Sequence, residues 1–171
     1  MNNTTRLLLA AAICASMAAC TKKKDVMTPA AGETTRPPSQ VEPASSGGRY
    51  TAEDLDTDSC LRQRVVYFDY DQANIRSEFA AQMSCHAKYL QDQSSARITL
   101  EGHADERGSR EYNIGLGERR GNAVNGALTS NGGSASQLSV VSYGEERPTC
   151  NDSMDDCWGK NRRVEIVYTA R

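Results

Sequence analysis

The charged residues between positions 98 and 124 are the part of this chain best suited to bind a ligand. Arg120 shares helical spacing with apolar neighbours, so its guanidinium is expected on the inward side of a helix, where a charge needs a partner. Asp105 lies in the loop ahead of that helix and is a carboxylate that could stand near Arg120. The inward stripe is predicted to comprise Leu116, Arg120, Ala123, Val124 and Ala127.

Spacing alone leaves two interpretations of this Asp and Arg open. They could form an internal ion pair that only fastens the loop to the helix. They could instead bind a ligand that carries both charges, with its carboxylate on Arg120 and on free amides at the helix N-terminus, and its ammonium group on Asp105. The end of an amino acid fits this description, and binding it requires no bond breaking.

A glycosidase is the enzymatic alternative, because several carboxylates could supply its acid and base. Arg107 and Arg110 in the same charged loop would neutralise them, and a domain this small suggests no long substrate cleft. We therefore predict that the protein is not an enzyme. The carboxylates are Asp69, Asp71, Glu101 and Asp105.

A metal site is weakly suggested at the same place. Glu101, His103 and Asp105 alternate along the chain like half of a ligand set, but the only other histidine, His86, falls on a different predicted helix. A second histidine ligand is therefore unsupported, and no metal or cofactor is expected.

The first 49 residues indicate export and a lipid anchor. Arg6 followed by an apolar run over 7–19 predicts a signal peptide at residues 1–19, which is too short to span a membrane. Small residues lead up to Cys20 in a pattern that resembles a lipobox, so we expect cleavage before Cys20 and its acylation. Residues 20–49, rich in Pro, Ala, Ser, Thr and Gly, predict a flexible tether.

The cysteines favour disulfide bonds. Of the six, one falls in the signal peptide and Cys20 is acylated, which leaves an even set of four in an oxidising compartment. We predict the pairs Cys150–Cys157, which closes a short loop, and Cys60–Cys85, which ties the segment before the first strand to the first helix. Four free buried thiols remain the alternative; a zinc set is less favoured, since no pair has zinc-knuckle spacing.

Residues 50–171 predict one folded domain with the element order βαβαββ. Alternating or continuous apolar runs predict strands over residues 65–68, 97–102, 138–143 and 164–168. A helical stripe from Ile75 to Leu90 predicts the first helix, and residues 113–130 predict the second, with Asn113 as its N-cap. The expected fold is an α/β sandwich with helices packed on one face of a mixed sheet.

Glycines are unusually frequent in the second predicted helix. Each can cost up to about 1 kcal/mol relative to alanine in an exposed helix interior, so packing must hold this helix. Gly115 and Gly117 could alternatively let a ligand approach the backbone. The four are Gly115, Gly117, Gly121 and Gly126.

Three sequence blocks carry a family resemblance: residues 101–108 (EGHADERG), 111–114 (EYNI) and 116–120 (LGERR). With residues 66–71, 141–145 and 160–164 they resemble, in the right order, the OmpA-like C-terminal domain family over positions 64 to 168.

The resemblance implies what the site binds. The implied ligand is the zwitterionic end of meso-diaminopimelate in the peptidoglycan stem peptide, held noncovalently. The principal roles fall to Asp105 and Arg120, with Arg107 as an auxiliary carboxylate contact. The pocket wall falls to Tyr70, Asp71 and Leu116, and Asn113 would order the loop and cap the helix.

The resemblance also implies a place in the cell. It indicates a lipoprotein of the outer membrane that faces the periplasm, links that membrane to the cell wall during division, and has a TolB-like β-propeller partner. Apart from the resemblance, the chain could be purely a protein-interaction module with Tyr112, Trp158 and Tyr168 as anchors. A formal net charge of −2 without a basic patch argues against nucleic acid.

Overall fold

The computed structural model describes residues 48–171. The predicted signal peptide, the Cys20 lipidation site and nearly all of the predicted tether lie outside the described residues. Four strands are present: β1 (Val65–Tyr67), β2 (Arg97–His103), β3 (Leu138–Gly144) and β4 (Arg163–Ala170). The helices are α1 (Asp54–Thr57), α2 (Ala80–Asp92), α3 (Arg110–Ser130) and α4 (Asp155–Asn161), with short 3₁₀ turns at Ser77–Phe79 and Ala135–Gln137.

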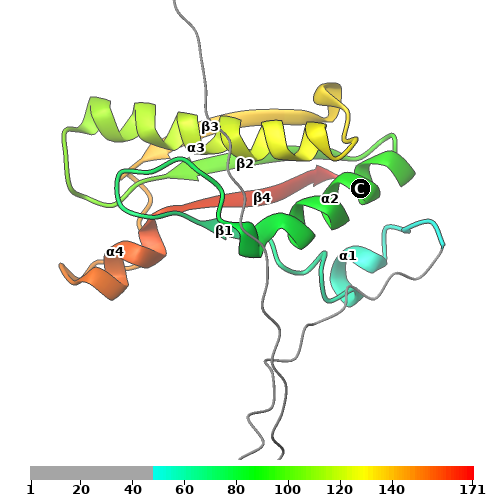
Figure 1. Ribbon diagram of the computed structural model, residues 1–171, viewed down its shortest axis with the longest axis horizontal. Helices are drawn as coiled ribbons and strands as arrows, with labels where there is room; N and C mark the ends of the chain where they lie inside the picture. The colour runs from blue at the N-terminus through cyan, green and yellow to red at the C-terminus, as the bar shows by residue number, and fades with distance from the viewer. Residues whose placement is uncertain (1–47) are drawn as a thin grey trace, which may run out of the picture. The chain divides into compact units, whose positions relative to one another are not determined.

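The strands form one mixed sheet in the order β1-β4-β2-β3. Strand β4 is antiparallel to both of its neighbours, β1 and β2, while β3 is parallel to β2. Strands β1, β2 and β3 therefore all run toward the same end of the sheet, and β4 starts there (Figure 1). The predicted mixed sheet with helices on one face is confirmed.

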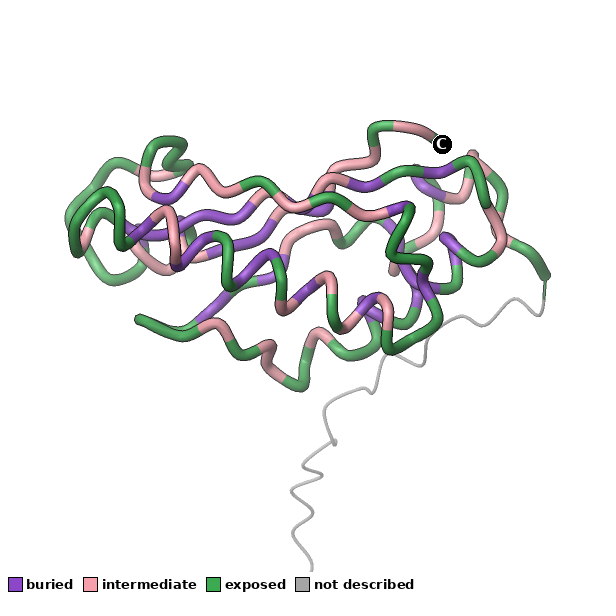
Figure 2. Tube along the Cα trace, turned by 90° about the horizontal axis from the view of Figure 1, so that it is seen from above, coloured by how far each residue is buried: buried purple, intermediate pink, exposed green. Residues whose placement is uncertain are grey.

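The core lies between the sheet and α2 and α3. Because side chains alternate along a strand, Ile98, Leu100 and Ile166 face the helices while the intervening residues face the other way. The buried positions in Figure 2 accordingly follow the strands and the inner sides of the helices. Helix α2 contributes Met83, Ala87 and Leu90, and α3 contributes Val124 and Leu128.

Helix boundaries differ from the sequence prediction. Helix α3 begins at Arg110, because the Tyr112 backbone N–H donates to the Ser109 hydroxyl at 3.2 Å. The predicted N-cap role of Asn113 is therefore wrong, and this residue lies inside the first turn. Helix α2 begins only at Ala80, after a 3₁₀ turn, and a further short helix, α4, lies between the last two predicted strands.

Glycines let α3 lie close to the sheet. A Cβ placed on Gly117 would lie 2.9 Å from the Gly102 carbonyl oxygen of β2 and would also overlap Ser142 of β3. A Cβ on Gly121 would lie 2.5 Å from a methyl group of Val140. The glycines at this contact thus permit the packing that holds α3. Because Gly117 faces the sheet, the alternative that it lets a ligand approach the backbone is wrong.

Two glycines of α3 are expected to respond oppositely to alanine. Gly126→Ala should raise the free energy of unfolding by up to about 1 kcal/mol, because its new Cβ meets no atom within 4 Å and alanine favours helix. Gly117→Ala should lower the free energy of unfolding by about 2 kcal/mol through overpacking against β2. Urea denaturation of both variants is the measurement. Changes of the same sign would contradict this packing account.

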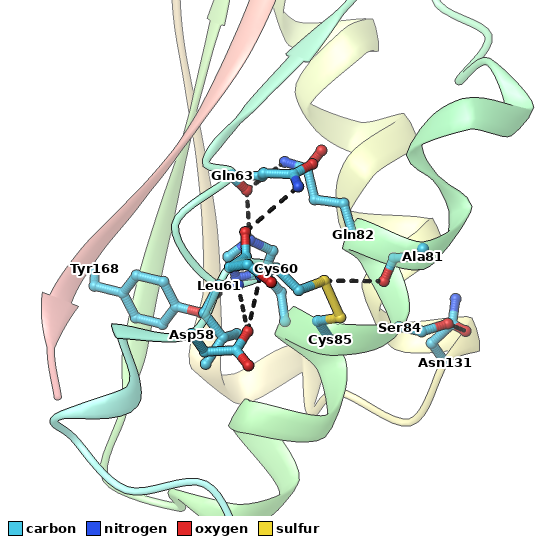
Figure 3. Close-up of a disulfide and its surroundings, with 12 residues drawn as sticks. Asp58, Cys60, Leu61, Gln63, Ala81, Gln82, Ser84, Cys85, Asn131 and Tyr168 are labelled. Carbon is cyan, nitrogen blue, oxygen red and sulfur yellow. Dashed lines mark hydrogen bonds between the residues drawn. A yellow bond between two sulfur atoms is a disulfide. The ribbon is translucent and has the colours of Figure 1, made fainter. Parts of the chain in front are cut away.

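The structure contains both predicted disulfide bonds. Cys60–Cys85 joins the segment before β1 to α2, with a Cα–Cα distance of 6.3 Å, and Asp58 accepts the backbone N–H groups of Cys60 and Leu61 beside it (Figure 3). Cys150–Cys157 closes a short loop that leads into α4, with a Cα–Cα distance of 5.3 Å. Each bond therefore fixes a segment that lies outside the sheet.

The first described residues are attached to the end of α2. Arg49 Nη2 and the Tyr50 backbone N–H each donate at 2.8 Å to Asp92, to its carbonyl and its carboxylate respectively. This contact lies at the end of the sheet where β2 begins, opposite the end where β2 leads into the loop before α3 (Figure 1). Among residues 48–171, no helix has the length and apolar character needed to cross a membrane.

Candidate functional site

A cavity of about 220 Å³ lies where β1 and β2 end. The segment after β1, the loop after β2 and the first turns of α3 form its walls, which explains why residues distant in sequence meet here. Six of the seven predicted ligand-binding residues line it, and Asn113 does not. The lining residues are Tyr70, Asp71, Asp105, Arg107, Gly108, Tyr112, Leu116 and Arg120.

Arg120 is fully buried and is held by backbone carbonyls. Its Nε donates to Gln72 O at 2.8 Å, Nη1 to His103 O at 2.8 Å and Nη2 to Asp69 O at 3.1 Å. In the described structure Arg120 forms no ion pair with Asp105, so the internal salt bridge allowed by the sequence is wrong. Three of the five guanidinium N–H groups are used, which leaves donors for a ligand.

Burial lowers the pKa of Arg120 to about 10, because the charged form is poorly solvated. The guanidinium nevertheless remains charged at neutral pH. Its central carbon lies 5.3 Å from the centre of the Phe68 ring. The sequence prediction that Arg120 faces inward is confirmed, and the site therefore contains a fixed, buried positive charge.

Asp105 is buried and is paired with two arginines. Arg107 donates to it through Nη2 at 2.6 Å, Nε at 3.2 Å and its backbone N–H at 3.1 Å, and Arg162 Nη1 donates at 3.2 Å. Burial raises the pKa of the carboxyl, but these hydrogen bonds outweigh burial and leave its pKa below the usual value. Asp105 is thus a carboxylate at neutral pH.

Arg162 is a site residue that the sequence prediction missed. Arg162 stands 57 positions after Asp105 in the chain. It reaches Asp105 because β4 starts at the end of the sheet where β2 finishes. Its Nε also donates to Phe68 O at 3.0 Å, which joins the segment after β1 to the site.

Arg107 lies between two aromatic rings. Its guanidinium carbon is 4.0 Å from the centre of the Tyr70 ring and 4.2 Å from that of Trp158 on α4. The hydrogen bonds with Asp105 raise the pKa of Arg107. The sequence prediction placed Arg107 at the site but did not include Trp158, which stands far along the chain between the last two predicted strands.

Asp71 is the carboxylate at the mouth of the cavity. Its backbone has φ 55°, an uncommon left-handed conformation for a residue other than glycine. The Tyr112 hydroxyl from α3 donates to its carboxylate. This contact connects the segment after β1 to α3, and it leaves most of the Asp71 carboxylate free to accept from a ligand.

Asn113 supports the loop from behind the cavity. Its side chain is buried, and Nδ2 donates to Asp105 O at 3.1 Å and to the Glu145 carboxylate. Asn113 therefore contacts the loop that carries Asp105 but does not line the cavity.

The structure separates the groups required by the alternative sites. Glu101 pairs in register with Glu165 and lies on the face of the sheet opposite Leu100 and the helices. His103 shares that face and is buried with neither ring nitrogen hydrogen-bonded. Among the described residues no group of three or more metal-ligating side chains is present, and only Asp71 and Asp105 of the proposed glycosidase carboxylates line the cavity.

Comparison with known proteins gives consistent matches. The sequence model of the OmpA family matches residues 67–162. The peptidoglycan-associated lipoprotein of Pseudomonas aeruginosa is 45% identical over 113 residues, which are 66% of this chain and 67% of that protein. The protein of the same name from Haemophilus influenzae is 40% identical over 125 residues, 73% of this chain and 79% of that protein.

A solved structure also matches. The crystal structure of the peptidoglycan-associated lipoprotein from Burkholderia pseudomallei superposes with a TM-score of 0.66 at 37% identity. The match covers 68% of this chain and 98% of that chain. Because the crystallised chain consists almost entirely of the matched part, this fold forms without further domains.

Proposed function

The chain belongs to the OmpA family and, within it, to the peptidoglycan-associated lipoproteins, and on this premise we propose that its cavity binds the zwitterionic end of the meso-diaminopimelate side chain in the peptidoglycan stem peptide. Family membership supports a peptidoglycan-binding lipoprotein of the cell envelope that is not an enzyme. The observation that carries the proposal is one cavity of about 220 Å³ lined by both carboxylates and arginines.

The proposed pose pairs each ligand charge with the opposite charge. The ligand carboxylate accepts from the unused N–H groups of Arg120, and the ligand ammonium donates to Asp71 and Asp105. Asp105 already accepts four hydrogen bonds, three of them from Arg107. The ammonium therefore displaces part of Arg107, whose guanidinium can then turn onto the ligand carboxylate. Leu116 and Tyr70 contact the apolar stem of the side chain.

Discrimination against lysine follows from the same arrangement. A lysine-containing stem peptide offers the ammonium but lacks the second carboxylate. The Arg120 donors would then remain buried without a ligand acceptor, which costs about 1–3 kcal/mol for each unsatisfied group. The site is therefore expected to prefer diaminopimelate peptides.

The wider role proposed here joins two layers of the envelope. Acylated Cys20 would anchor the chain in the outer membrane, residues 20–49 would form the tether, and the folded domain would bind the cell wall. The cavity lies at the end of the sheet opposite Arg49 and Tyr50, which supports this arrangement because the site faces away from the attached end. We further propose a TolB-like partner and a role in the Tol-Pal system during cell division.

The test is calorimetric titration of residues 48–171 with a diaminopimelate-containing stem peptide beside its lysine-containing counterpart. We expect the diaminopimelate peptide to bind at least about tenfold more tightly, since about 1.4 kcal/mol of discrimination corresponds to that ratio. Equal affinity for the two peptides would indicate that the charged residues of the cavity stabilise the fold and do not recognise the second carboxylate. Release of soluble fragments from purified cell wall would instead indicate a hydrolase.

A further inference from the structure

We propose that the loop closed by Cys150–Cys157 positions Trp158 against Arg107, a residue that lines the ligand site, and that Trp158 thereby holds Arg107 ready for the ligand. The inference rests on the proposed function for its ligand. It adds a positioning residue, Trp158, and a covalent bond that determines where this residue lies. The sequence blocks that carry the family resemblance do not include residues 150–158.

Two aromatic rings stack on the guanidinium of Arg107. Tyr70 and Trp158 cover its guanidinium from two parts of the chain that are 88 positions apart, with ring centres at 4.0 and 4.2 Å. An arginine side chain at a protein surface otherwise has many rotamers, and fixing it on binding costs entropy. The two rings restrict the guanidinium before the ligand arrives and can stay stacked on it while it moves from Asp105 onto the ligand carboxylate, so less entropy is lost on binding.

Trp158 is fixed by a hydrogen bond to the loop after β2. Its indole Nε1 donates to Glu106 Oε1 at 3.0 Å, and the Ser153 hydroxyl donates to the same oxygen at 2.8 Å. Glu106 lies between Asp105 and Arg107 in the chain, so both hydrogen bonds attach the α4 region directly to the site loop. The indole must keep its position for the Arg107 stack and the Glu106 hydrogen bond to form together.

The Cys150–Cys157 disulfide bond holds the short helix that carries Trp158. Helix α4 has only seven residues, and isolated helices of this length are not stable by themselves. Cys157 precedes Trp158 directly, and its bond to Cys150 fixes the start of the helix. Asn161 then holds Cys150 at both backbone groups, accepting from its N–H at 3.1 Å and donating to its carbonyl at 2.7 Å. Opening the disulfide should release this whole segment and, with it, the indole.

The chain contains its own matched control. Cys60–Cys85 is also a disulfide bond outside the sheet, but it joins the segment before β1 to α2, and neither cysteine belongs to the segment that carries Trp158. Removing it should affect the folded domain without moving Trp158. The double variants Cys150→Ser/Cys157→Ser and Cys60→Ser/Cys85→Ser therefore separate an effect on the site from a general effect of losing a disulfide.

The experiment combines two measurements on residues 48–171. The first is affinity for the diaminopimelate-containing stem peptide. The second is fluorescence emission, to which Trp158 contributes as the only tryptophan of the chain. The Cys150→Ser/Cys157→Ser variant is expected to lose roughly fivefold in affinity, the ratio that one cation–π contact represents, and its emission should shift to longer wavelength. The Cys60→Ser/Cys85→Ser variant should change neither quantity.

Substitutions of Trp158 test its contact with Arg107 directly. Trp158→Ala should reproduce the affinity loss of the Cys150→Ser/Cys157→Ser variant, and Trp158→Phe, which keeps a ring over Arg107, should restore most of it. Unchanged or tighter binding in a folded Cys150→Ser/Cys157→Ser variant would overturn the proposal. If the unaltered protein does not bind the peptide, the proposed function fails. If the fluorescence emission of the ligand-free Cys150→Ser/Cys157→Ser variant is not shifted, the link between the disulfide bond and Trp158 is refuted separately.

Discussion

Arg120→Met is expected to lower the free energy of unfolding by about 4 kcal/mol, which would leave a domain of ordinary stability close to unfolding. The physical reason is that the buried guanidinium donates to three backbone carbonyls, of Gln72, His103 and Asp69. Methionine fills similar space but leaves these acceptors without a donor, and each buried unsatisfied group costs about 1–3 kcal/mol. Urea denaturation followed by circular dichroism measures the change.

Arg119 provides the control for this experiment. It neighbours Arg120 on α3 but is exposed, so Arg119→Met should change the free energy of unfolding by no more than about 0.5 kcal/mol. If the two variants were equally stable, the carbonyl contacts of Arg120 would have no structural importance. The comparison also decides how to interpret any lost binding in Arg120 variants, because an unfolded domain cannot report on a ligand contact.

Asp105→Asn is expected to weaken binding of the diaminopimelate peptide by about 100-fold, which corresponds to about 2.7 kcal/mol. The variant keeps the size of the side chain but removes its negative charge, so Arg107 and Arg162 are left to repel the ligand ammonium. Calorimetric titration measures the loss. The same loss of a negative charge at Glu101, on the opposite face of the sheet, should leave the affinity unchanged, and Glu101→Gln is therefore the matched control.

The pKa of Asp105 predicts how this binding depends on pH. Because the pKa is lowered in the folded protein, the carboxylate is still mostly charged at a pH equal to the ordinary aspartate pKa of about 3.9. Its contribution to binding is lost only as the pH falls through the lower folded-state pKa. Affinity should consequently be constant between about pH 5 and 7. A loss of affinity within that range would show that a different group controls binding.

The sequence predicted the strands and the inward position of Arg120, because both follow from periodicity. Period-two alternation located β2 and β3 almost to the residue. The partners of Arg120 could not be predicted in this way, since they are carbonyls whose direction depends on the loops at Asp69 and Gln72. Local propensity was equally insufficient at the start of α3, where Ser109 and Asn113 are both good N-caps and only tertiary packing selects Ser109.

The contacts that Arg162 and Trp158 make with the site could not be predicted from the sequence, for a different reason. Arg162 and Trp158 join the site only because β4 and α4 return to the end of the sheet where β2 finishes. Strand order is not encoded in local patterns, so neither residue could be assigned to the cavity. Helix α4 is also short and depends on Asn161 and a disulfide bond, which give no helical periodicity to detect.

The attachment of Arg49 and Tyr50 to Asp92, at the end of the sheet opposite the cavity, has a mechanical consequence. A tensile force between the first described residues and a ligand in the cavity would act along β1 and β2. Ladder hydrogen bonds of antiparallel pairs lie across the strands, so such a force shears several bonds together and does not open them one at a time. Cys60–Cys85 would transmit part of the load covalently to α2. The fold would therefore resist pulling between Arg49 and Tyr50 at one end and the proposed ligand at the other.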